Sequence, residues 1–396
     1  MTGRPDIRVR TPATPEPTLD DATPHPHPTP PDATLIGEAA RVGGDDAPVA
    51  AHPSAPLEIR SQVKVGESGA TIPSGENATT SPMDPQLTTI QPGGGVVMSI
   101  ELAWGRFRRW RLRKLRPAYV ARMKDRRLGQ RGSLTFEPVD SRDMKYYRNQ
   151  DSYYWADADD RFLWRDSLPF VRVGLAELVV LGSGALLLAL LMGLAWWPLA
   201  LPGLVVAGLI VWFFRNPRRV IPNQVGTVVS PADGKLVEIC EVDDPELGPM
   251  WRFGIFLSIF NVHANRASLP GRVMSVRYRP GKMLNALRPE SARENENLDI
   301  ELASDDLNGR VIRIRQITGQ FARRIVCWAR VGDVFSRGEM YGMIKLGSRT
   351  ELWIPRAESL EVVAEVGQKV RAGSTVFARY PQDVFARHHS NHGQAI

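Results

Sequence analysis

The sequence predicts a mainly β domain, preceded by a hydrophobic helical hairpin and by a disordered N-terminal extension. Three observations lead to this prediction: an early concentration of proline, one long apolar run, and short β-prone runs that fill the last part of the chain. They divide the 396 residues into an extension (1–97), a basic and aromatic segment (98–172), an apolar hairpin (173–214) and a β domain (215–396).

The extension contains about half of the chain's prolines and shows no sustained apolar periodicity. Such a segment cannot bury enough surface to offset the entropy that it would lose on folding, so we predict disorder. Met98 begins the first segment with structured character and is an alternative start of the chain.

The basic segment has twelve Lys or Arg side chains and one acid, Asp125, between residues 106 and 131. Trp104, Phe107 and Trp110 lie within this run or just before it. A solvated basic helix and a nucleic-acid-binding segment both fit the pattern. The apolar run that follows favours an anionic membrane surface as the partner, because anionic headgroups attract basic clusters beside membrane segments. We therefore expect no nucleic acid partner.

The apolar run carries one charge, Glu177, and is interrupted by Trp196-Trp197-Pro198. As a single helix it would be about 60 Å long, twice the hydrocarbon core of a bilayer, so two helices at about 176–195 and 199–214 fit better. A hairpin that dips into one leaflet and a buried pair of soluble helices are the alternatives. Arginines on both sides predict that both ends lie at the cytoplasmic face of the cell membrane, together with the β domain.

The β domain is predicted from short runs of β-prone residues at a spacing typical of a sandwich or barrel. The predicted strands are 227–229, 235–239, 253–260, 272–278, 311–317, 324–329, 343–346, 352–354, 362–363 and 375–378. Residues 366–376 resemble the closing hairpin of barrel-sandwich hybrid domains, which include lipoyl and biotinyl carriers. No lysine lies in a tight exposed hairpin, which argues against a carrier function.

The two cysteines, Cys240 and Cys327, each lie within an apolar run. They give neither a disulfide framework nor a metal-binding spacing, so we expect buried thiols in a reducing compartment and no metal.

Gly347 and Ser348 separate two β-prone runs, and composition alone predicts a turn there. A chemical interpretation is also open, because no side chain shields a glycine carbonyl and a serine hydroxyl held against it can attack when a base is near. Asp233 and His263 are the residues that could complete such a base-activated serine. Their ordinary alternatives are a turn aspartate and a hydrogen-bonded histidine.

Several sequence blocks carry a family resemblance. They are Phe213-Phe-Arg-Asn-Pro-Arg218, Ser230-Pro-Ala-Asp-Gly-Lys235, Val262-His-Ala-Asn-Arg266, Gly319-Gln-Phe-Ala-Arg-Arg-Ile325, Arg337-Gly-Glu and Gly342-Met-Ile-Lys-Leu-Gly-Ser-Arg349. In this order they resemble phosphatidylserine decarboxylase of the short, bacterial and archaeal type, across roughly residues 176–381. The chain departs from the family at Phe260, where the longer branch has a second histidine, at Asn297, which replaces an arginine, and at Leu346, which replaces a phenylalanine.

The resemblance implies that Ser348 attacks the Gly347 carbonyl with His263 as base and Asp233 behind it, cutting the chain between 347 and 348. The new α chain would begin with a pyruvoyl group derived from Ser348 and would remain with the β chain as a heterodimer. This cofactor would supply the electron sink for converting phosphatidylserine to phosphatidylethanolamine without pyridoxal phosphate. His263, with a pKa of about 6.5, would serve as base and acid in turn.

Four cations, Arg323, Arg324, Lys345 and Arg349, are candidates for binding the substrate phosphate or carboxylate, with solvated strand charges as the alternative. Two other functions stay open. One is a membrane-tethered, non-catalytic β hybrid module with a binding or structural role, and the other is a pyruvoyl decarboxylase with another amino-acid-type substrate.

Overall fold

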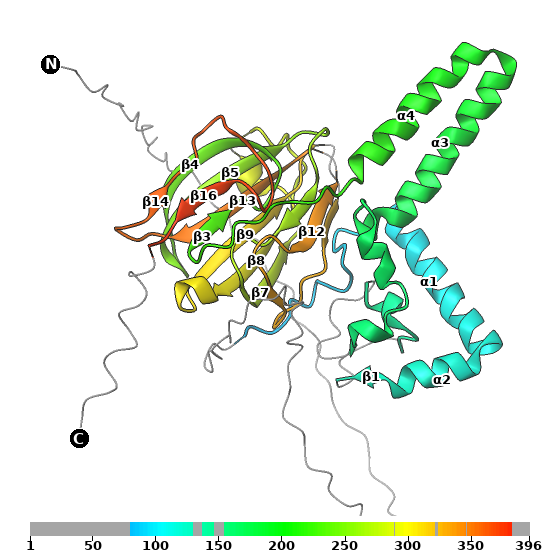
Figure 1. Ribbon diagram of the computed structural model, residues 1–396, viewed down its shortest axis with the longest axis horizontal. Helices are drawn as coiled ribbons and strands as arrows, with labels where there is room; N and C mark the ends of the chain where they lie inside the picture. The colour runs from blue at the N-terminus through cyan, green and yellow to red at the C-terminus, as the bar shows by residue number, and fades with distance from the viewer. Residues whose placement is uncertain are drawn as a thin grey trace, which may run out of the picture. The chain divides into compact units, whose positions relative to one another are not determined.

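The computed structural model describes residues 80–129, 137–145, 154–288, 290–320, 324–345 and 347–381. Most of residues 227–379 form antiparallel sheets (Figure 1), and the predicted mainly β class is confirmed. The strands are β3 (Thr227–Val229), β4 (Gly234–Asp244), β5 (Gly248–Leu257), β6 (Ala264–Arg266), β7 (Gly271–Arg279), β8 (Asn297–Ser304), β9 (Val311–Ile317), β10 (Arg324–Cys327), β11 (Val334–Phe335), β12 (Met340–Lys345), β13 (Ser348–Pro355), β14 (Glu361–Val362), β15 (Lys369–Val370) and β16 (Val376–Arg379).

One sheet of eight strands, in the order β11-β7-β8-β9-β13-β5-β4-β15, curls into a half-barrel. Two sheets of three strands, β10-β12-β6 and β14-β16-β3, accompany it. A short helix, α5 (Ser291–Glu294), precedes β8. Strand β8 was not predicted from the sequence. Leu298, Ile300 and Leu302 nevertheless alternate with polar residues, as expected for a half-buried strand.

Strand β13 shows how the sequence alternation divides the eight-stranded sheet into two faces. Leu352 and Ile354 lie in the main hydrophobic core. Arg349, Glu351 and Trp353 alternate with them and therefore point to the other face, because successive side chains of a strand lie on opposite sides.

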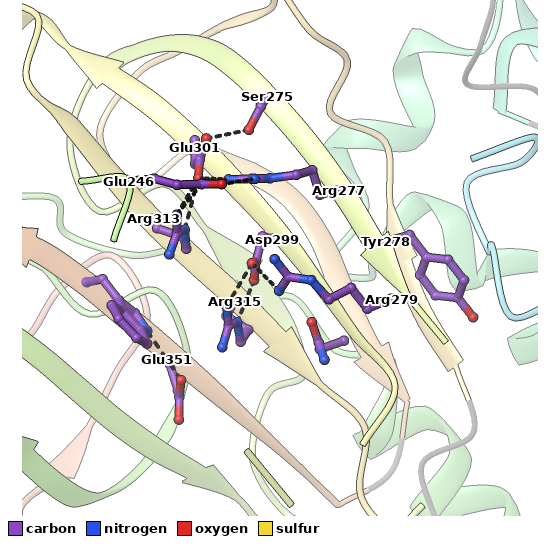
Figure 2. A network of polar contacts seen from close by, with 12 residues as sticks. Glu246, Ser275, Arg277, Tyr278, Arg279, Asp299, Glu301, Arg313, Arg315 and Glu351 are labelled. Atoms are coloured by element: carbon purple, nitrogen blue, oxygen red, sulfur yellow. Dashed lines mark hydrogen bonds and ion pairs between the residues drawn. The ribbon is translucent and has the colours of Figure 1, made fainter. Parts of the chain in front are cut away.

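The other face carries a network of paired charges that spans neighbouring strands (Figure 2). Arg313 and Arg277 both bond to Glu301, and Arg313 donates to it from Nε at 2.9 Å. Arg315 bonds to Asp299, with Nε 2.6 Å from the carboxylate. Burial would be costly for unpaired charges, and this cross-strand pairing offsets that cost for Arg313 and Arg315.

The apolar hairpin consists of α3 (Leu175–Ala195) and α4 (Ala200–Phe213), which lie side by side and antiparallel. Gly203 allows close packing, because a Cβ at this position would lie 2.7 Å from the Cβ of Ala189. The helical segment 172–195 is long and apolar enough to cross a membrane, whereas 197–213 is shorter. By length and composition this is weak support for membrane association.

The base of the hairpin packs on the three-stranded sheet β10-β12-β6. A second hydrophobic cluster joins Phe214 and Val171, which flank the hairpin, to Val262, Val326 and Met343 of the β domain. The hairpin is therefore attached to the same strands that lead into the candidate site.

The basic segment contains α1 (Val96–Leu115) and α2 (Pro117–Asp125), followed by a short ladder of β1 (Arg127–Leu128) with β2 (Tyr154–Trp155). Part of its charge is paired, since Arg108 and Arg109 are 5% exposed and bond to the buried carboxylate of Asp143. On another part of α1, Trp104 and Trp110 remain more than half exposed.

The structure corrects the predicted extent of the disordered extension. Residues 1–79 lie outside the described residues, but residues 80–97 are part of the fold. Leu87 is fully buried in the main core, and the backbone oxygen of Ile90 accepts a hydrogen bond of 2.9 Å from the amide of Cys327. Two apolar side chains in a polar stretch are too few to predict this packing from sequence.

Candidate functional site

The strand pairings place His263 and Ser348 on neighbouring connections between strands, although they are 85 positions apart in the sequence. β5 leads through residues 258–263 into β6, and β12 leads through 346–347 into β13. β5 and β13 are paired in the eight-stranded sheet, and β6 and β12 are paired in the sheet β10-β12-β6. The two connections therefore pass side by side from one sheet to the other, and we call this place the crossing. The amide of Ile344 donates to the backbone oxygen of His263 at 3.2 Å, which fixes one side of this crossing.

Gly347 and Ser348 form the start of β13 with unusual local geometry. Gly347 has a φ of +50°, a left-handed conformation that favours glycine over residues with a Cβ. Ser348 is fully buried, and its Oγ has no hydrogen-bond partner within the described part of the chain. A buried hydroxyl without a partner costs free energy, so this position is a candidate for chemistry rather than for structural support. Leu346 lies outside the described residues.

The carbonyl of Gly347 packs directly against Gly319, which follows β9. A Cβ at Gly319 would lie 2.0 Å from the Gly347 oxygen and 3.0 Å from its carbonyl carbon. The same atom would lie 3.3 Å from the Cβ of Ala286. Glycine at 319 is therefore required for this close approach, and the carbonyl that the sequence singled out is held in a defined place.

His263 is buried beside the hairpin, with only 1% of its surface exposed. Its Nδ1 lies 2.9 Å from the carbonyl oxygen of Asn261, and because a carbonyl only accepts, Nδ1 carries the proton. Nε2 is then the basic nitrogen, and it is buried without a partner among the residues described. The imidazole lies 4.6 Å from the ring of Phe213, between ring centroids.

Burial, together with the positive charge of Arg215, lowers the pKa of His263 to about 4. The pKa therefore differs from the expected value near 6.5, because the charged imidazolium would lose its hydration. The ring is neutral at physiological pH and able to accept a proton.

Asp233 lies in the turn before β4, and its carboxylate is engaged by groups other than the imidazole. Arg219 Nη2 bonds to both of its oxygens, at 2.9 and 2.7 Å, and the amide of Ala372 donates to Oδ1 at 2.8 Å. Nδ1 of His263 donates its hydrogen bond to the carbonyl oxygen of Asn261 instead. The structure thus places Asp233 where it connects the chain after the hairpin to the β domain.

Two of the candidate substrate cations are paired with carboxylates. Lys345 forms an ion pair with Glu177 in the first turn of α3, and burial lowers the Lys345 pKa. Arg349 lies on the sheet face opposite to Ser348 and bonds to Glu351 at 2.9 Å.

Arg324 packs against the backbone of Gly95, where a Cβ would lie 1.8 Å from Nη2. Arg323 lies outside the described residues.

Three buried polar residues beside the site were not singled out from the sequence as functional. Gln316 Nε2 donates to Asn265 Oδ1 at 2.9 Å, and Asn265 Nδ2 donates to Thr350 Oγ1 at 3.2 Å. Thr350 is two positions after Ser348 and shares its face of β13. Thr350 could have been found from the sequence, because side chains two positions apart in a strand point to the same face. Gln316 could not, because it lies beside Thr350 only through the pairing of β9 with β13.

The comparisons with known proteins agree with one another. A sequence model of the phosphatidylserine decarboxylase family matches residues 206–378. A phosphatidylserine decarboxylase proenzyme of Rhodopirellula baltica is 73% identical over 239 residues, which are 60% of this chain and 100% of that protein. Proenzymes of the same name from Cupriavidus pinatubonensis and Symbiobacterium thermophilum are 40% and 43% identical over 202 and 185 residues. These matches cover 50% and 46% of this chain and 90% and 84% of the relatives.

Proposed function

The chain belongs to the phosphatidylserine decarboxylase family of enzymes, and we propose that it converts phosphatidylserine to phosphatidylethanolamine with a pyruvoyl group made from its own Ser348. The observation that carries the proposal is the pair of buried, unpartnered atoms, Ser348 Oγ and His263 Nε2, on two neighbouring chain crossings. The relatives are named proenzymes, which fits an enzyme that is completed by cleavage of its own chain.

In the proposed self-cleavage, neutral His263 takes the hydroxyl proton of Ser348 through Nε2. The Oγ then bonds to the carbonyl carbon of Gly347, which Gly319 holds in place, and the peptide bond to the nitrogen of Ser348 breaks. Protonated His263 then returns its proton to the departing nitrogen, and its lowered pKa makes this imidazolium more acidic than an ordinary one. The ester that results is then broken by elimination: Cα of residue 348 loses its proton, the bond from Cβ to the ester oxygen breaks, and one chain ends at the Gly347 carboxylate. The dehydroalanine left at position 348 takes up water and releases ammonia, which leaves the pyruvoyl group.

Position 348 fits a pyruvoyl group, since the serine that would supply it is buried and its hydroxyl has no partner among the described residues. When formed, such a group supplies a carbonyl that accepts the electron pair left by decarboxylation. His263 would hold the proton that is delivered to the product carbon, and the buried crossing would exclude water from it.

The orientation of the imidazole is assigned to the Asn261 carbonyl in this proposal, with Asp233 acting at longer range through Arg219. We expect Asp233→Asn to slow self-cleavage less than His263→Ala does. Equal loss in the two variants would support the simple Asp-His-Ser triad that the sequence suggested.

Cleavage would leave the two chains together as a heterodimer. β13 begins at Ser348 and pairs with β5 on one side and with β9 on the other. The new α chain would therefore keep both hydrogen-bonded ladders after the break. This geometry supports a stable αβ enzyme.

The hairpin would hold the enzyme at its lipid substrate, on the cytoplasmic face of the cell membrane. Moving a diacyl lipid out of the bilayer exposes its acyl chains to water, which is strongly unfavourable. An active site at the base of a membrane hairpin would reach the headgroup without removing the lipid from the bilayer. The exposed aromatic residues and exposed cations of α1 would add contacts with anionic headgroups.

Intact mass of the purified protein tests the proposal. We expect a fragment of about 5 kDa, because 49 of the 396 residues of this 44.0 kDa chain follow Gly347, and its first position should be blocked. Ser348→Ala and His263→Ala should leave the chain intact. The wild type should also form phosphatidylethanolamine from phosphatidylserine in mixed micelles. An intact chain that persists on incubation would contradict the cleavage, and cleavage without this lipid product would indicate another substrate.

A further inference from the structure

The last turn of α4 contacts a short loop beside the candidate base. Trp212 Nε1 and Arg215 Nη2 both donate to the carbonyl oxygen of Phe260, at 3.2 and 2.8 Å. The guanidinium of Arg215 also lies 3.9 Å from the ring centroid of Trp212. Phe213, between these two residues, contacts the His263 ring. The end of the hairpin therefore contacts both the loop before His263 and the ring of His263, the proposed base.

The loop, residues 258–261, is held in one conformation and presents apolar side chains to the outside. The Asn261 side-chain oxygen accepts from both the amide and the hydroxyl of Ser258, each at 2.8 Å. Ile259 and Phe260 remain 45% and 60% exposed. A fixed loop with outward apolar side chains is typical of a surface that contacts lipid or another partner.

Arg215 differs in its bonding from three of the cations near the site. Lys345, Arg349 and Arg219 are each paired with carboxylates. The two hydrogen bonds of the Arg215 guanidinium go to the backbone oxygens of Trp212 and Phe260, so among the described residues its charge has no carboxylate partner. A guanidinium has five N–H donors, and three are left for a ligand.

The position and the bonding together suggest an anion that arrives from the membrane. Residues that end a membrane helix lie near the headgroups, and tryptophan prefers that level. Arginine binds phosphate with paired hydrogen bonds.

We propose that Arg215 binds the phosphodiester of the lipid substrate, and that Trp212, Ile259 and Phe260 contact the lipid beside it. The inference rests on the proposed function, because it names the headgroup subsite of the same active site. With the phosphate at Arg215, the headgroup amine extends toward the crossing that carries His263 and Ser348. The cations Lys345 and Arg349, which are paired with carboxylates, then serve the fold rather than the substrate.

The test uses the full chain with Ser348→Ala, in a nonionic detergent, so that binding is measured without cleavage or turnover. The ligands are short-chain phosphatidylserine and short-chain phosphatidylethanolamine at one fixed micelle concentration. Arg215→Gln should weaken the binding of both lipids by about 10- to 100-fold, the usual effect of losing a charge-assisted hydrogen-bonded pair. Arg218→Gln is the matched control, because this exposed arginine lies three positions further along and should leave the affinities unchanged.

Chemical protection gives a second measurement that does not depend on how a variant folds. Bound phosphatidylethanolamine should protect Arg215 of the Ser348→Ala protein from phenylglyoxal, while Arg218 continues to react. Absence of protection would overturn the assignment.

Equal losses in Arg215→Gln and Arg218→Gln would also overturn it, because they would indicate general attraction to charged micelles. Loss for phosphatidylserine alone would move the contact from the phosphate to the carboxylate and refute the proposal as stated. Failure of the proposed function is separate: it would appear as an uncleaved or inactive wild type, whatever the lipids bind.

Discussion

Gly319→Ala tests whether the position of the Gly347 carbonyl controls self-cleavage. The added Cβ would lie 2.0 Å from the Gly347 oxygen, where contacts below 3.0 Å essentially do not occur, so the carbonyl must move by about 1 Å. A displacement of this size at a reacting centre costs about 100-fold in rate, or about 2.7 kcal/mol of activation free energy. The backbone conformation of Gly319 is not left-handed, so alanine brings no additional strain there.

The assay follows the appearance of the 348–396 fragment by intact mass during incubation of freshly made precursor. Gly271→Ala is the matched control. Its Cβ would lie 2.3 Å from the backbone oxygen of Ala303, a similar clash at a distant place. Gly271 pairs with Ser304, seven residues along β8 from Asn297 at the site end, which is about 23 Å at strand spacing.

We expect Gly319→Ala to slow cleavage by about two orders of magnitude, while Gly271→Ala lowers the unfolding temperature and leaves the rate within a few-fold of wild type. Cleavage of Gly319→Ala at the wild-type rate would refute the role of this contact. Equal slowing in both variants would assign the effect to general loss of stability.

Three further predictions follow from the described contacts. Self-cleavage should stay constant from pH 7.5 to about 5 and fall only near pH 4, because the base must be neutral and burial lowers the pKa of His263 to about 4; a midpoint near 6.5 in the pH profile would contradict this. Glu177→Gln should lower the unfolding free energy by about 3 kcal/mol or more, since it leaves the Lys345 ammonium buried and unpaired, and Glu177→Leu combined with Lys345→Met should recover most of the loss in denaturant titrations. Replacing Trp104 and Trp110 by serine should weaken flotation with anionic vesicles more than it weakens DNA binding, and the opposite result would favour a nucleic acid partner.

The sequence predicted the parts of the fold that depend on local composition. The apolar hairpin follows from a run of apolar residues, and most strands follow from short runs of β-prone residues. The structure has these elements within a few residues of the expected places. The packing of Leu87 could not be predicted in the same way, because its partners are far along the chain and its neighbours are polar.

A candidate site residue could be singled out from the sequence when its own side-chain chemistry and its immediate neighbours are unusual. A serine after a glycine and a histidine after an apolar run are visible in the sequence, but their partners are decided by tertiary contacts. Nothing in the spacing distinguishes an Asp233 that faces His263 from one that binds Arg219. For Arg349 the signal was present, since a residue next to Ser348 in a strand must point to the opposite face.

Three contacts connect the hairpin to the site, and together they argue that it is more than an anchor. Phe213 lies against the His263 ring, Arg215 holds the Phe260 carbonyl, and Glu177 is paired with Lys345 of β12. The first helps to bury the imidazole and so to lower its pKa, which keeps the ring neutral. The last acts on the strand that ends two residues before Gly347. A hairpin that served only to tether the enzyme could be joined by a flexible linker, whereas these contacts predict that correct seating of the apolar hairpin is a condition for the proposed chemistry.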